Sequence, residues 1–130
     1  MTHAIRWVLV PVSAVVVWSG VLVLGFQAVH LLDALCPPKL VESGACIAPW
    51  HEPSIEALIV ITAGLAAFGI VAVGALVAPS HKLRVAAVLF ACGAVFAMYI
   101  VRAAGLSSPF FTAAGGGSVA LWLVNARGIR

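Results

Sequence analysis

WVLVPVSAVVVWSGVLVLGFQAVHLL, residues 7–32, decides the fold class because it contains no Asp, Glu, Lys or Arg. A helix needs about 20 mainly apolar residues to cross about 30 Å of hydrocarbon at 1.5 Å per residue, and this run is longer. It also exceeds the roughly 7 to 15 apolar residues of a signal-peptide core. The sequence therefore predicts a retained membrane-spanning helix rather than a cleaved leader.

The composition of the whole chain agrees with this interpretation. The 130 residues are 64% hydrophobic and 8% charged, and a mean hydropathy of +1.19 lies outside the range of soluble domains. Further apolar blocks follow at about 55–78, 85–104 and 109–126, the last being the weakest because it is rich in glycine. We predict an all-α integral membrane protein: one domain, residues 1–130, with four transmembrane helices in an up-down-up-down bundle.

Charged residues are distributed unevenly between the predicted loops. If both chain ends are cytoplasmic, five basic residues lie inside, namely Arg6, Lys82, Arg84, Arg127 and Arg130, and two outside, namely Lys39 and Arg102. All four acidic residues lie in or beside the outer loop of residues 33–53: Asp33, Glu42, Glu52 and Glu56. The excess of basic residues inside predicts a multi-pass protein of a bacterial-type plasma (inner) membrane, with both termini in the cytoplasm. The net charge of +3 is then a topology signal, and no nucleic-acid partner is expected.

The outer loop contains Cys36 and Cys46, on the side of the membrane predicted to be oxidising. This placement favours a disulfide, which would restrict the unfolded chain by about 3 kcal/mol. A catalytic thiol pair more often appears as Cys-x-x-Cys. Small four-helix quinone-linked thiol oxidoreductases are similar to this chain in size and span number only, because they also need a membrane-embedded Cys-x-x-Cys. Cys92 stands alone in the third apolar block and is expected to pack as a small apolar residue.

Residues near the predicted outer face could also serve as ligands for a metal ion or a haem. The candidate ligands near the outer face are His30, Cys36, Cys46, His51, Glu52 and Glu56. Two reduced cysteines and a histidine can bind zinc or copper, but Cys-x9-Cys-x4-His matches no tight ligand template. His30 and His81 lie near opposite membrane faces, so they cannot share a haem. We predict no metal and no cofactor other than bound lipid, and we expect His51 to lie in a solvated loop.

Local signals predict helix starts and packing faces. Ser54 is a candidate N-cap for the second helix, with Glu56 favoured by the positive helix end, and Pro109 suits the first turn of the fourth helix. Small residues at intervals of four permit close helix packing. The sets of this kind are Ala63/Ala67, Gly93/Ala97 and Thr112/Gly116/Ala120.

The helix interiors lack the paired ionisable residues or nucleophile arrangements that catalysis requires, so no catalytic residue is predicted. The leading hypothesis is a noncatalytic membrane subunit or accessory protein that packs against larger integral membrane partners. One alternative is a small oligomeric transporter or channel with His30, Glu56 and Arg102 lining an outer vestibule; another is a thiol-redox or metal-handling protein built on Cys36, Cys46 and His51. The residues expected to contact a partner or line the vestibule are His30, Trp50, His51, Glu52, Glu56 and Arg102.

Overall fold

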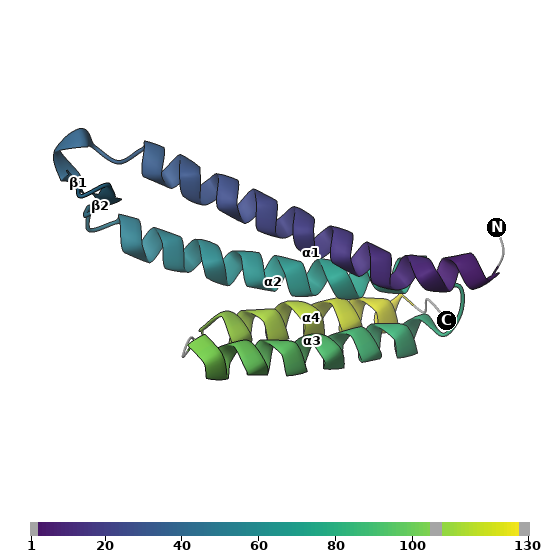
Figure 1. Ribbon diagram of the computed structural model, residues 1–130. Coiled ribbons are helices and arrows are strands. Elements are labelled where there is room, and N and C mark those ends of the chain that lie inside the picture. Colours follow the sequence, from purple (N-terminus) through teal and green to yellow (C-terminus); the bar gives the residue numbers. More distant parts are fainter. Residues whose placement is uncertain (1–2, 105–107, 128–130) are drawn as a thin grey trace.

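The computed structural model describes residues 3–104 and 108–127. Within them lie four helices: α1 (His3–Ala34), α2 (His51–Val77), α3 (Lys82–Ala104) and α4 (Ser108–Ala126). Successive helices run in opposite directions (Figure 1), so the predicted helix number and order are confirmed. Arg130 and residues 105–107, between the third and fourth predicted helices, lie outside the described residues.

The start of α2 differs from the prediction. The helix begins at His51 rather than at residue 55, and Pro53 falls in its first turn. Proline is compatible with this position because the first N–H groups of a helix have no intrahelical acceptor. The hydroxyl of Ser54 donates to the carbonyl of Trp50 at 2.7 Å, one turn back along the helix. The predicted N-cap role of Ser54 is therefore wrong.

α1 also begins four residues before its predicted start, at His3, and the remaining helix ends lie closer to the predicted ones. Pro109 is the second residue of α4, as expected for a first-turn proline. The start of α3 at Lys82, instead of residue 85, brings Lys82 and Arg84 into its first turn. The connection between α2 and α3 is correspondingly shorter than predicted.

Three helices in the described part of the chain are long and apolar enough to cross a membrane: Ile5–Ala34, His51–Val77 and Lys82–Ala103. Such a set is typical of a multi-pass membrane protein. The 19-residue α4 is not among them. Its Pro109, the glycines at 115–117 and two serines dilute its apolar content.

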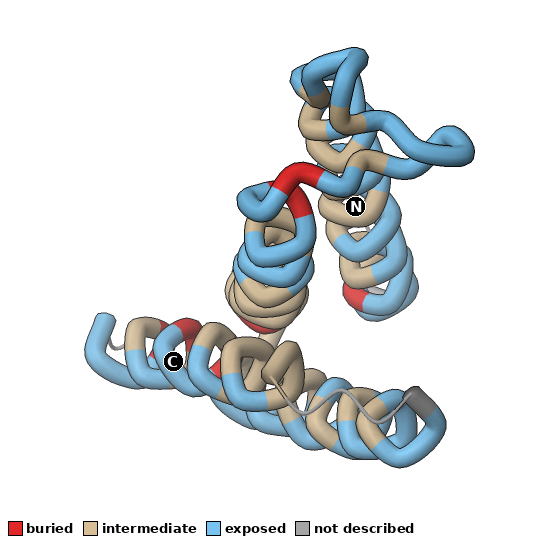
Figure 2. The backbone as a smooth tube through the Cα atoms, turned by 90° about the vertical axis from the view of Figure 1, so that its left-hand side faces the viewer, coloured by how far each residue is buried: buried red, intermediate tan, exposed pale blue. Residues whose placement is uncertain are grey.

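α2 is the central element of the fold. α1 packs along one side of α2, and α3 and α4 pack along a different side, as the end-on view in Figure 2 shows. The predicted antiparallel neighbours α2–α3 and α3–α4 are in contact, and α2 also packs extensively on α4. Extensive contacts of α1 within the described residues are with α2 alone. α1 therefore packs on the rest of the bundle mainly through α2.

The buried core lies at the end of the molecule where α2 leads into α3. It consists of Val71, Ala75, Ala86, Ala120 and Val124, contributed by α2, α3 and α4. Phe90 and Leu89 pack against it from α3. The three helices are thus joined closely at this end.

Residues 35–50, which we call the loop cap, join α1 to α2. They form a short 3-10 helix, Pro38–Leu40, and a two-stranded hairpin of β1 (Val41–Glu42) and β2 (Ala45–Cys46). Ser43 and Gly44 connect the strands with φ values of 52° and 84°. Positive φ at both residues is typical of a two-residue type I′ turn. The hairpin is an addition to the predicted all-α fold.

Candidate functional site

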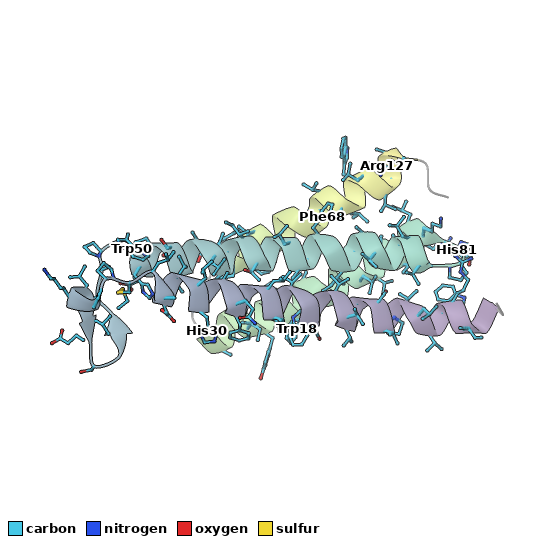
Figure 3. The ribbon with its side chains drawn as sticks, turned by 90° about the horizontal axis from the view of Figure 1, so that it is seen from above. Trp18, His30, Trp50, Phe68, His81 and Arg127 are labelled. Carbon is cyan, nitrogen blue, oxygen red and sulfur yellow. A yellow bond between two sulfur atoms is a disulfide. The ribbon has the colours of Figure 1, made fainter. Side chains whose placement is uncertain are left out.

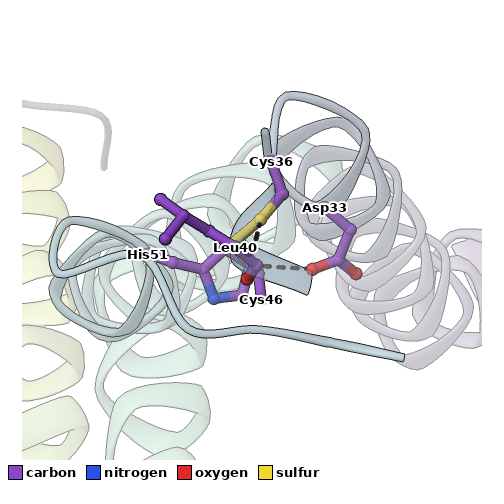
Figure 4. The surroundings of a disulfide bond; sticks show 5 residues. All are labelled: Asp33, Cys36, Leu40, Cys46 and His51. Carbon is purple, nitrogen blue, oxygen red and sulfur yellow. Dashed lines mark hydrogen bonds and ion pairs between the residues drawn. A yellow bond between two sulfur atoms is a disulfide. The ribbon is translucent and has the colours of Figure 1, made fainter. Parts of the chain in front are cut away.

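A disulfide closes the loop cap, as predicted. Cys36 and Cys46 are bonded, with their Cα atoms 6.0 Å apart, in the usual range for such a bridge. The Cys36 sulfur lies 3.7 Å from the carbonyl oxygen of Leu40 (Figure 4). A disulfide sulfur carries no proton, so this is a packing contact. The Leu40 carbonyl accepts instead from the backbone N–H of Ile47 at 2.8 Å, which ties the two sides of the cap together.

A second link joins the end of α1 to the start of α2. Nε2 of His51 lies 2.8 Å from Oδ1 of Asp33 (Figure 4). The His51 side chain is 11% exposed, whereas Asp33 is 52% exposed. Trp50 packs edge-on against the His51 ring, with centroids 5.8 Å apart. The expectation that His51 lies in a solvated loop is therefore wrong, because this ring is buried between the two helices and the cap.

An apolar groove of about 320 Å³ lies between α2, α3 and α4 and extends from the edge of the buried core, at Val71, toward the start of α4. Small residues make room for it: Ala63, Ala67, Gly93, Ala97 and Ala113. Aromatic side chains line it: Phe90, Phe96, Phe110 and, from α1, Trp18. Trp18 lies midway along α1, as Figure 3 shows.

A second hollow of about 410 Å³ continues the groove toward the start of α2. Ile59 and Pro109 line both spaces, so the two adjoin. Glu52 and Glu56, which lie one helical turn apart and are both exposed, line the second hollow with His51 and Ser108. We call this hollow the acidic mouth. The ion pair found among the described residues joins His51 to Asp33 and leaves both glutamates outside it.

The side of α1 that faces away from α2 carries polar residues. Val17 approaches Gly69 and Gly25 approaches Thr62, which defines the side of α1 that packs on α2. The opposite side is exposed along its length, and we call it the outward face of α1. It consists of Val16, Gly20, Val23, Gln27 and His30, at helical intervals of three and four.

The predicted vestibule residues lie on different parts of the molecule. Glu56 lines the acidic mouth, together with Glu52 and His51. His30 lies on α1 and Arg102 near the end of α3, both exposed and neither among the residues lining the mouth. Trp50 is exposed at the end of the loop cap.

The predicted small-residue sets serve different purposes. Gly116 of α4 lies so close to the backbone of Gly64 in α2 that an added Cβ atom would overlap it. Thr112, one turn away, also meets Gly64, and Ala120 is 1% exposed. Gly93 and Ala97 of α3 line the apolar groove instead, and a Cβ atom at Gly93 would meet no described atom within 4 Å.

Sequence reasoning missed the hairpin and the His51–Asp33 contact. The Ser43-Gly44 dipeptide is a turn signal that could have revealed the hairpin. The contact has no local signal, because its residues lie 18 apart in sequence. Within residues 3–104 and 108–127, no group of three or more His, Cys, Asp and Glu side chains could hold a metal ion. The free Cys92 is exposed on α3.

Comparisons with protein-family models, with curated proteins and with solved structures find no match to this chain.

Proposed function

We propose that this protein is a noncatalytic subunit of a membrane complex, and that the outward face of α1 packs against another integral membrane protein. The observation that carries the proposal is the exposure of Gln27 and His30 on that face. Polar side chains on a membrane helix usually face protein or a water-filled cavity, because hydrocarbon offers them no hydrogen-bond partner. Hydrogen bonds across a helix interface are worth about 1 kcal/mol each. Gly20, about two turns before Gln27, would allow a neighbouring backbone to approach closely.

The proposed membrane is a bacterial-type plasma membrane, with both ends of the chain in the cytoplasm. His81 and Arg127 lie at the end of the molecule opposite Trp50 and the loop cap (Figure 3). Lys82 and Arg84 follow His81 directly in the chain. The positive-inside rule favours a cytoplasmic location for this basic end. The disulfide at the other end is compatible with an oxidising compartment.

The test is purification of the tagged protein from its native membrane in a mild detergent, comparing Gly20→Leu with Gly115→Leu. An added Cβ atom would meet no described atom within 4 Å at either glycine, so both substitutions start in open space within the described structure. We expect the unchanged protein and Gly115→Leu to recover a second membrane protein in stoichiometric amount. Gly20→Leu should lose at least nine tenths of it, which corresponds to about 1.4 kcal/mol of interface free energy.

A photo-crosslinking residue placed at Gln27 supplies an independent readout. It should form an adduct with the same partner in intact membranes, whereas the crosslinker at Gly115 should not. Recovery of the protein only as a monomer would contradict the proposal. Recovery only as a homo-oligomer would contradict it too, and would favour the transporter or channel alternative.

A further inference from the structure

We propose that the apolar groove and the acidic mouth form one binding site for a single-chain amphiphile with a cationic head. The alkyl chain would occupy the groove between α2, α3 and α4. The head, of the alkylammonium type, would lie beside Glu52 and Glu56. This site is separate from the outward face of α1, so the inference goes beyond the proposed subunit role.

The shape of the space supports one alkyl chain. The groove measures about 320 Å³, at the lower end of the range for small-molecule sites. Aromatic side chains, namely Phe90, Phe110 and Trp18, and several small residues line it. Because Ile59 and Pro109 border both spaces, a chain in the groove would place its head beside the mouth. This volume suits one alkyl chain better than the two chains of a phospholipid.

The charges around the mouth favour a cation. Glu52 and Glu56 bring two negative charges to the mouth, and both side chains are exposed. Neither takes part in the His51–Asp33 ion pair found among the described residues. The N-terminal ends of α2 and α4 border the mouth, and each contributes about half a positive charge. The mouth therefore keeps a net negative charge. Arg102, the basic residue near the end of α3, does not line it.

The test uses fluorescence of Trp18, which lines the groove. In a variant carrying Trp7→Phe, Trp50→Phe and Trp122→Phe, the remaining indole reports on groove occupancy. The protein is placed in phosphatidylcholine nanodiscs and titrated with dodecyltrimethylammonium carrying bromine at the chain end. The matched anionic probe is dodecyl sulfate brominated at the same position. The assay contains no second protein, so its result is independent of the subunit proposal.

We expect saturable quenching by the cationic probe and only weak, linear quenching by the anionic one. Glu52→Gln with Glu56→Gln should weaken binding of the cationic probe about tenfold, the equivalent of 1.4 kcal/mol. Gly93→Leu should abolish saturable quenching, because the leucine side chain would occupy the groove that Gly93 lines. A Cβ atom at this position meets no described atom within 4 Å, so it causes no clash there. Gly115→Leu, also open at Cβ and not among the residues lining the groove, should bind as the parent does.

Two results would overturn the proposal. Linear quenching by both probes would mean that they only partition into the bilayer. Saturable quenching of equal strength by both would mean that the site takes acyl chains, including those of bilayer lipids, without regard to head charge. Circular dichroism of each variant, with helix content equal to the parent, confirms that a loss of binding is not a loss of fold.

Discussion

At the residue scale, the contact between His51 and Asp33 is unequal: the buried His51 ring relies on Asp33 for its hydrogen bond, whereas Asp33 can bond to water. The His51 ring is almost fully enclosed, so its nitrogen has little access to water. Asp33 is half exposed and can be solvated when the contact is absent. The cost of breaking the contact therefore falls mainly on the histidine, and it is largest when Asp33 is the residue removed.

Asp33→Ala should lower the free energy of unfolding by about 1–3 kcal/mol, the usual cost of an unsatisfied buried donor. Asp33→Asn should lose less than half as much, because its amide oxygen can still accept from Nε2. Thermal or denaturant unfolding in one detergent, followed by circular dichroism at constant pH, measures both values. Equal losses for the two variants would show that the hydrogen bond to His51 is not what stabilises this junction.

At the element scale, the contact between α2 and α4 depends on glycine. Gly116 lies against the backbone of Gly64, where a side chain at position 116 would push the two helices apart. The neighbouring Gly115 faces open space within the described structure. Adjacent glycines in one helix therefore have different roles, and only the position relative to α2 distinguishes them.

Gly116→Ala should destabilise the protein by about 1–3 kcal/mol, the typical cost of overpacking a close contact. Gly115→Ala should be neutral or stabilising by up to about 1 kcal/mol, because alanine favours a helix over glycine. Unfolding of the two variants under identical detergent conditions gives the comparison. A Gly116→Ala variant as stable as Gly115→Ala would contradict the close α2–α4 packing.

At the scale of the whole molecule, α1 and α2 project beyond α3 and α4 at the end that carries the loop cap (Figure 1). The 27-residue α2 exceeds the 19-residue α4 by about 12 Å at 1.5 Å per residue. The disulfide and the His51–Asp33 contact both lie at this projecting end and hold it together. The acidic mouth opens beside it, between the start of α2 and the start of α4.

Cysteine labelling in intact cells tests the proposed orientation. In a Cys92→Ala background, Glu52→Cys should react with a membrane-impermeant maleimide added outside, because the start of α2 would face that side. Arg84→Cys, at the start of α3, should react only after the membrane is permeabilised. Both residues are exposed, so accessibility within the protein is matched. The reverse pattern would place the loop cap in the cytoplasm.

The sequence by itself determined the helix number, the helix order and the disulfide. Each depends on a property read locally: the length of an apolar run, or two cysteines close together in one loop. Helix starts were less accurate, because Pro53 is acceptable within a first turn as well as before a helix. Ser54 likewise can either cap a helix or donate to the preceding turn, and its sequence neighbours do not distinguish these roles.

Only the tertiary structure decided which faces meet. α2 is apolar all round, so its sequence does not mark one side for α1 and another for α4. The choice depends on the fit of small residues in three dimensions, as where Gly116 meets Gly64. The same fit leaves the outward face of α1 uncovered and the groove open beside Gly93. These features depend on distances between separate helices, which a pattern along one chain does not contain.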